Sequence, residues 1–231
     1  MPAIFISTQP FPYIRAASLT ELLESYGDSG LKLSAKDLDM KVTAGSGSYT
    51  AVLNGTVVLY DATSFMQSPQ EYAEAQLTAL THLQEQARNL LTNTQVAERK
   101  LMQGLTYLNS HQRHWKKAAI TIAKLAYTYL FFIPEGTLNP KVGRQKILSK
   151  LEKQARAYES AAAVFSYGYE FFTGLETTAE ANDSTKAKLA ECARIAHNLS
   201  AVYSMIATTN IHNGESASAM IDTLYANNRK I

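Results

Sequence analysis

The side chains best suited to metal binding are five histidines, and their spacing does not build a metal site. His111 and His114 are three residues apart, which on a helix would direct two imidazoles toward one ion. Arg113, Lys116 and Lys117 lie beside them and would repel a cation. The chain has no His-Glu-x-x-His sequence and no facing Glu-x-x-His pairs. We therefore expect no metal site, and surface histidines instead.

Nucleophilic, phosphate-binding and acid–base motifs are also missing. Cys192 lies on an apolar helical repeat, and His197, five residues later, falls on another face, so a buried structural thiol is expected. Gly45-Ser-Gly47 lies between two predicted strands and not before a helix, which indicates a turn. The chain lacks GxxxxGK[ST] and GxSxG. Carboxylates are almost absent from the apolar stretches. We expect a non-enzymatic protein without a cofactor.

Long helices dominate the chain after residue 67. Ser68-Pro69-Gln70-Glu71 has the residues of a helix start, and an apolar seam with an average step of 3.5 follows it. The seam is Ala73, Leu77, Leu80, Leu83, Ala87, Leu90, Thr94, Ala97, Leu101, Leu105 and Leu108. Asn93 and Gly104 are candidate kinks. Two further seams step by three and four: Leu148, Leu151, Ala155, Tyr158, Ala162, Phe165, Tyr169 and Phe172, then Leu189, Cys192, Ala196, Leu199, Tyr203 and Ile206. Gly168 and Gly174 weaken the end of the first of these, and His212-Asn-Gly214 predicts a break before a short last helix, 216–226.

Residues 118–133 form the most apolar stretch. Its polar residues, with Lys117 before it, fall at Thr121, Lys124 and Thr128 and make one narrow helical stripe. A membrane-spanning helix needs about 20 apolar residues with few charges. This run is shorter and carries Lys124 near its middle, so we interpret it as the buried central helix of a bundle. The alternative is a helix that is sheltered in one state and exposed in another.

The first 65 residues differ from the rest. Ser18-Leu-Thr-Glu21 has the form of a capping box and predicts a short helix over 19–25. Asn54-Gly55 between apolar residues predicts a β-hairpin that pairs Tyr49 with Tyr60 and Ala51 with Val58. Residues 40–44 are a candidate third strand. The predicted fold is mainly α: an antiparallel bundle of four long helices plus a short C-terminal helix, with a small N-terminal β-hairpin or meander. We divide it into an N-terminal segment, 1–66, and a long-helix bundle, 67–231.

Composition places few limits on location. The chain is 46% hydrophobic and 18% charged, so it can bury a large core. One cysteine excludes an internal disulfide and indicates a reducing compartment. The start of the chain lacks the basic-then-apolar order of a secretory signal. We expect a cytoplasmic protein, in the cell that makes it or after delivery into another, without a transmembrane helix.

The charge distribution is the strongest functional signal. Between Arg99 and Arg156 lie twelve basic residues opposed by Glu135 and Glu152, a net charge of +10, and the remainder carries −8. The candidate residues for an anionic partner are Arg113, Lys116, Lys117, Lys141, Arg144, Lys146, Lys150, Lys153 and Arg156. A solvated face paired with acidic residues of 71–98 or 176–191 would give the same pattern.

Three functions agree with these observations. The first is a helical-bundle interaction protein whose basic face binds an acidic protein surface or anionic lipid. The second is a membrane-active, pore-forming type of protein that exposes 118–133, with candidate contacts at Trp115, Tyr127, Tyr129, Phe131 and Phe132. The third, nucleic-acid binding, has only His114-Trp115-Lys116 in its favour. Self-association through the sheet edge or the long seams is a further expectation.

Overall fold

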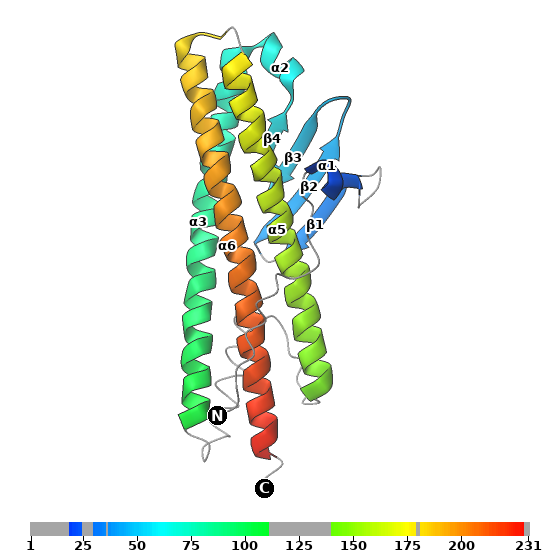
Figure 1. Cartoon of the computed structure of the whole chain (residues 1–231), viewed down its shortest axis with the longest axis vertical. Coiled ribbons are helices and arrows are strands. Elements are labelled where there is room, and N and C mark those ends of the chain that lie inside the picture. The colour runs from blue at the N-terminus through cyan, green and yellow to red at the C-terminus, as the bar shows by residue number, and fades with distance from the viewer. Residues whose placement is uncertain (1–18, 25–29, 36, 111–139, 179–180, 229–231) are drawn as a thin grey trace.

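The fold consists of long helices with one small sheet (Figure 1). A computed structural model describes residues 19–24, 30–35, 37–110, 140–178 and 181–228. The three long helices are α3 (Pro69–Ser110), α5 (Pro140–Thr178) and α6 (Asp183–Asn228), and the two short ones are α1 (Leu19–Glu24) and α2 (Ala62–Gln67). The strands are β1 (Leu31–Ala35), β2 (Leu38–Ala44), β3 (Tyr49–Leu53) and β4 (Thr56–Tyr60).

Helix α6 lies between the other two long helices and packs against both (Figure 1). It follows α5 after a short connection and runs antiparallel to it. It runs in the same direction as α3: the Cys192 thiol donates to Ala73 O at 3.9 Å, and further along both helices Asn213 Nδ2 donates to Thr94 O at 3.5 Å. Helices α3 and α5 are therefore antiparallel to each other.

The predicted seams form the core. In α3, the seam residues from Ala73 to Leu105 are buried or half-buried. In α6 the whole predicted seam, Leu189 to Ile206, is buried. In α5 the seam is buried at Ala155, Tyr158, Ala162, Phe165 and Phe172. Among the α5 seam residues whose burial is described, Tyr169 is the exception, with 43% of its surface exposed and its ring 5.3 Å from that of His197.

The sheet is an antiparallel meander in the order β1-β2-β3-β4. The predicted hairpin is confirmed in its register, since Tyr49 pairs with Tyr60 and Ala51 with Val58. Asn54 and Gly55 both have positive φ, at 48° and 80°, as a two-residue type I′ turn requires. The predicted third strand is confirmed as β2. Strand β1 and helix α2 were not predicted.

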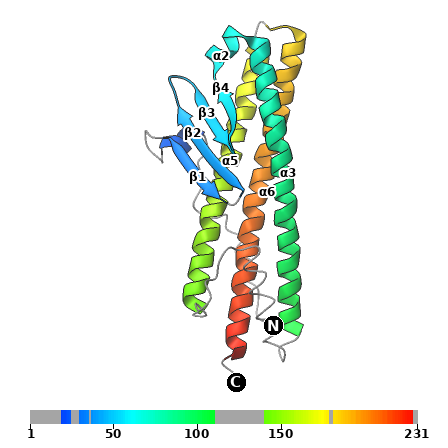
Figure 2. The same ribbon diagram turned by 180° about the vertical axis from the view of Figure 1, so that it is seen from behind.

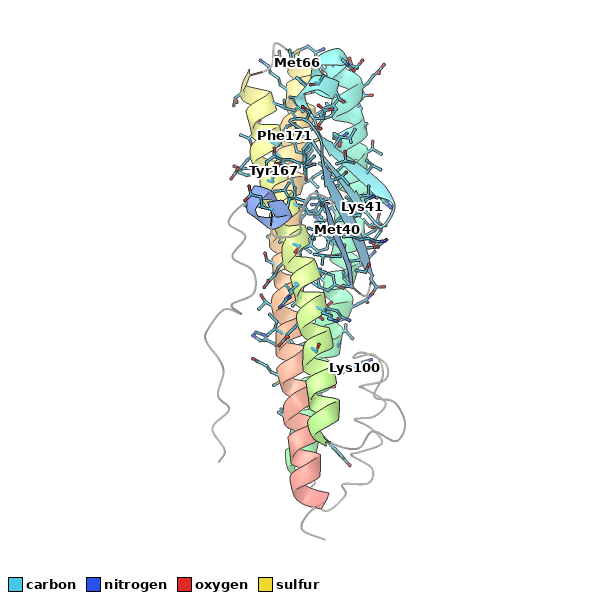
Figure 3. The ribbon with its side chains drawn as sticks, turned by 90° about the vertical axis from the view of Figure 1, so that its right-hand side faces the viewer. Met40, Lys41, Met66, Lys100, Tyr167 and Phe171 are labelled. Carbon is cyan, nitrogen blue, oxygen red and sulfur yellow. The ribbon has the colours of Figure 1, made fainter. Side chains whose placement is uncertain are left out.

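One face of the sheet packs on the helices. Met40 is buried and Lys41 is exposed (both labelled in Figure 3), and the same alternation places Leu31, Val42 and Val58 in the core. The second face of the sheet is turned away from the long helices (Figure 2). The buried face of the sheet and the helix seams form one continuous hydrophobic core.

Tyr60 is the anchor of the sheet on α5. Its side chain is fully buried, and its hydroxyl donates to Val164 O at 3.0 Å. Burial raises the pKa of this phenol far above its usual value, so the hydroxyl remains a donor. The ring lies against Gly168, where a Cβ atom would come within 2.6 Å of the Tyr60 oxygen and 3.0 Å of the ring carbons. Gly168 therefore makes room for Tyr60.

Helix α3 holds the outer edge of β4. The N–H of Leu59 donates to Gln76 Oε1 at 2.9 Å, and the hydroxyl of Tyr72 donates to Leu59 O. The N–H and C=O of Leu59 both point away from β3. Hydrogen-bonded and non-hydrogen-bonded pairs alternate along this hairpin, and Ala51–Val58 is a hydrogen-bonded pair, so the next pair, Thr50–Leu59, is not. The edge groups of Leu59 are thus satisfied by two side chains of α3.

The predicted break in α6 is wrong. The helix continues from Asp183 to Asn228 through His212, Asn213 and Gly214, so there is no separate short C-terminal helix. Asn213 and Gly214 are buried. Asn213 faces Thr94, the one polar residue of the α3 seam. Packing against α3 outweighs the poor helix propensity of these residues. Helix α3 is likewise unbroken at Asn93 and Gly104.

The remaining differences concern the number of long helices. The structure describes three long helices where the sequence predicts four. The predicted central helix, 118–133, lies outside the described residues. The predicted N-terminal helix is confirmed as α1, and the predicted start at Pro69 is confirmed as the start of α3.

We predict opposite effects for two glycine substitutions in α5. Gly168→Ala should lower the free energy of unfolding by about 1–3 kcal/mol, because the new Cβ overlaps Tyr60 and neither backbone nor ring can move freely. Gly174→Ala is the matched control, since nothing lies within 4 Å of its Cβ position. It should raise stability by about 0.5–1 kcal/mol, because alanine favours the helix. Urea unfolding of both variants measures the difference, and equal effects would refute the role given to Gly168.

Candidate functional site

The described part of the predicted basic face lies on the N-terminal half of α5. Its members are Lys141, Arg144, Lys146, Lys150, Lys153 and Arg156. Lys153 is exposed and Arg156 is half-buried. Arg113, Lys116 and Lys117 lie outside the described residues, so the structure does not test the second cluster.

The chain path adds two residues to this region. Because α3 and α5 are antiparallel, the C-terminal part of α3 lies at the same end of the bundle as the start of α5 (Figure 1). Arg99 and Lys100 are exposed there, and Lys100 lies well beyond the sheet (Figure 3). The fold therefore places basic residues of α3 and α5 at the same end of the bundle, on either side of α6, although Lys100 and Lys141 are 41 positions apart in the sequence.

The described part of the bundle is electrically polarised along its length. We define the basic half as residues 91–110, 140–156 and 206–228, and the sheet half as residues 61–90, 157–178 and 183–205. The basic half has eight Lys and Arg against four Asp and Glu. The sheet half has four Lys and Arg against nine Asp and Glu. The net charges are +4 and −5, so the charge asymmetry of the sequence becomes an asymmetry in space.

Two of the acidic residues considered as partners of the basic face, Glu74 and Glu191, pair elsewhere. Lys188 of α6 pairs with Glu74 of α3, and this hydrogen bond holds the pKa of the Glu74 carboxyl below its usual value. Arg194 Nε donates to Glu191 at 2.7 Å, which lowers the pKa of Glu191. Both pairs lie in the sheet half.

In the basic half, the carboxylate of Glu98 lies beside a histidine. It is 3.9 Å from the ring of His212 on α6, so this contact joins α3 to α6 and not to α5. The explanation in which acidic residues of 71–98 or 176–191 cover the basic face is therefore weakened for Glu74, Glu98 and Glu191.

The candidate membrane contacts cannot be placed. Trp115, Tyr127, Tyr129, Phe131 and Phe132 all lie outside the described residues. Among the helices that are described, none has a stretch both long and apolar enough to cross a membrane.

The expectation of no catalytic or metal centre is not tested by the residues that the structure describes. In that part of the chain, no group of three or more His, Cys, Asp or Glu side chains is arranged to hold a metal ion. His111 and His114 are outside it. Glu159 of α5 is half-buried, and this burial raises the pKa of its carboxyl against the opposing effect of Arg156.

Gly45 N donates to Ser48 O at 2.8 Å, which confirms the predicted turn between β2 and β3.

The structure also shows a cleft that sequence reasoning missed. It is open, has a volume of about 540 Å³, and lies between the ends of the two hairpins and α3. Seven polar side chains line it together with Ala35, Leu38 and Leu90: Ser34, Asp37, Asp39, Asn54, Gln86, Asn89 and Asn93. Gln86, Asn89 and Asn93 follow helical spacing, which was the available signal, but their position beside the hairpins depends on the tertiary fold.

Asn54 forms two hydrogen bonds to the backbone of other residues that line this cleft. Its Oδ1 accepts from the backbone N–H of Asp39 at 2.7 Å, and its Nδ2 donates to Asp37 O at 3.1 Å. The amide thus joins the two turns of the meander. With amides, a hydroxyl and two carboxylates and no basic side chain in its lining, the cleft suits hydrogen-bond donors, neutral or positively charged, and disfavours anions. The one hydroxyl in its lining, that of Ser34, donates to Asp39 Oδ1 at 2.9 Å, and no histidine lines the cleft.

Comparison of the chain with protein-family models, with curated proteins and with solved structures finds no match.

The environment of Cys192 gives a prediction about reactivity. Burial raises the pKa of this thiol to about 12, and the side chain is enclosed between α6 and α3. Relative to the ordinary value of 9.0, this lowers the thiolate fraction at neutral pH roughly a thousandfold. Alkylation by iodoacetamide at pH 8 should therefore be slower by at least that factor in the native protein than in guanidinium chloride. Comparable rates in the two conditions would show that the thiol is accessible and would refute the assignment.

Proposed function

We propose that this chain is a non-enzymatic interaction protein that binds an anionic partner through its basic half. The observation that carries the proposal is the accumulation of Arg99, Lys100 and the α5 residues 141–156 at the end of the bundle remote from the sheet. The partner is an anionic lipid surface or an acidic protein surface, and the experiment below distinguishes the two.

The separation between the centres of the basic half and the sheet half supports this function. Each half contains about 20 residues of each long helix, which at 1.5 Å per residue corresponds to roughly 30 Å. Charges on exposed surfaces are screened over about 8 Å at physiological ionic strength. The acidic sheet half therefore does not neutralise the basic half, and an approaching anionic surface meets a local positive potential although the chain has a net charge of only +2.

The matched test compares charge removal in the two halves. Lys150→Gln with Lys153→Gln removes two positive charges from the basic half. Arg88→Gln with Lys186→Gln removes two from the sheet half and is the control with the same net charge. Each basic residue near an anionic membrane contributes about 1 kcal/mol, so the first pair should weaken binding to phosphatidylserine vesicles roughly thirtyfold. The control should bind almost as well as the unchanged protein.

Binding is measured by vesicle flotation on anionic and neutral vesicles, at low and raised salt. Salt-sensitive binding to anionic vesicles alone identifies the lipid surface. If no vesicle is bound, retention on immobilised polyglutamate, with the same difference between variants, identifies an acidic protein surface. Equal weakening by both pairs, or no binding to either anion, would contradict the proposal.

The same experiment separates the two alternatives. Salt-resistant binding to neutral vesicles with release of an enclosed dye would favour the membrane-active protein, in which 118–133 inserts into the bilayer. Retention of a DNA or RNA oligonucleotide with a steep salt dependence, together with failure to bind polyglutamate, would favour the nucleic-acid binder.

A further inference from the structure

The two edge strands of the sheet, β1 and β4, differ in the hydrogen bonds of their outward backbone groups. At the β4 edge, the outward N–H and C=O of Leu59 are bound by Gln76 and Tyr72 of α3. At the β1 edge, the outward backbone groups belong to Lys32 and Ser34, since Leu31, Leu33 and Ala35 face β2 in the alternating pattern. Within the described part of the chain, no hydrogen bond joins these outward groups to another element. Lys32 and Ser34 are also exposed.

The outer face of the sheet has an unusual charge arrangement near this edge. Lys32 lies directly opposite Lys41, and like charges in this position destabilise a sheet. Two residues further along β1, Ser34 lies opposite Asp39, and its hydroxyl donates to Asp39 Oδ1 at 2.9 Å. The outer face near β1 thus carries a positive row, Lys32 and Lys41, beside a negative row, Ser34 and Asp39.

We propose that β1 pairs antiparallel with β1 of a second copy of this chain, about a two-fold axis at Leu33, and extends the sheet from four to eight strands. In this register Lys32 of one copy forms a hydrogen-bonded pair with Ser34 of the other, and the reverse pair is equivalent. The positive row of each copy then continues into the negative row of its partner. Lys32 and the partner's Asp39 are separated by two strand spacings, or about 10 Å, which the two side chains together can span.

Other registers are less favourable. A two-fold axis at Lys32 would place the two Lys32 side chains opposite each other, with Lys41 next to each of them. A two-fold axis at Ser34 would leave Lys32 without an acidic neighbour across the interface. Lysine on a sheet edge normally prevents strand addition. Here it rejects the wrong registers and is compensated only in the one centred on Leu33.

A charge exchange tests the register. Lys32→Glu should weaken the dimer roughly tenfold or more, because the new carboxylate faces the partner's Asp39. The fold should tolerate this change, since the introduced carboxylate would lie opposite Lys41 and remove a repulsion within the sheet. The double variant Lys32→Glu with Asp39→Lys should restore the dimer, because each copy then supplies both exchanged charges. Sedimentation velocity from about 1 to about 300 µM protein gives the dissociation constants.

A proline pair tests the edge itself. Ser34→Pro removes one outward N–H of β1 and should abolish the dimer, because an edge strand tolerates proline but can no longer donate there. Val57→Pro is the matched control on β4, where the residue is 46% exposed and its N–H also points outward. It should leave dimerisation unchanged.

A cysteine variant gives a site-specific result. Leu33→Cys places two thiols at the axis in a non-hydrogen-bonded pair, whose Cα separation of about 4.5 Å permits a disulfide. The native Cys192 is buried and contributes no background. Val57→Cys is the control and should remain uncrosslinked.

Three results would overturn the proposal. These are a monomer at every concentration, a dimer that survives Ser34→Pro, and crosslinking of the Leu33→Cys variant that is no faster than crosslinking of the Val57→Cys variant. Failure of the charge exchange to restore association, with the single variant impaired, would show that β1 pairs in a different register and would overturn the proposed one.

Discussion

The arrangement of this protein depends on how closely one tyrosine approaches a helix. The four-stranded sheet has one apolar face, which has to be covered by another layer of the fold. It must be held by the helices, and the deepest contact is Tyr60 against the backbone of α5 at Val164 and Gly168. The rings of Tyr167, Phe171 and Phe172 surround that tyrosine with centroids 5.3 to 5.8 Å away. These contacts combine burial of aromatic area with a satisfied hydroxyl.

The rest of the architecture follows from this position. Helix α6 packs against both α3 and α5, and the sheet contacts α3 through β4 and α5 through β1, β2 and Tyr60 of β4. The sheet therefore connects the two helices that flank α6. Its placement also decides which strand edge α3 binds and which remains outward. The cleft lined by Asn54 is also a consequence of where the sheet is fixed, because strand residues and α3 residues line it together.

Sequence reasoning was most successful where one local rule had no competitor. Asn54-Gly55 determined both a turn type and a register, and the three- and four-residue steps of Leu189 to Ile206 determined a buried face. It failed where distant residues outweighed local preference, as at Asn213-Gly214, where burial against α3 keeps the helix intact. Strand β1 was missed because a five-residue alternating stretch is a weak signal. The basic segment was evident from counting charges, but its position on one half of the bundle required the directions of α3 and α5. The cleft required the contact between hairpins and helix.

The parallel course of α3 and α6 has a consequence for how the chain folds. Helices α5 and α6 are joined by a short connection, so their interface forms with little loop-closure entropy. Ala73 and Cys192, or Thr94 and Asn213, are instead 119 residues apart, and Tyr60 is 104 residues from Val164. Contacts of such long sequence separation slow the folding of a domain. The α5–α6 hairpin is thus the part of the core that can assemble from its own sequence. The sheet and α3 can complete that core only after the C-terminal hairpin has been synthesised.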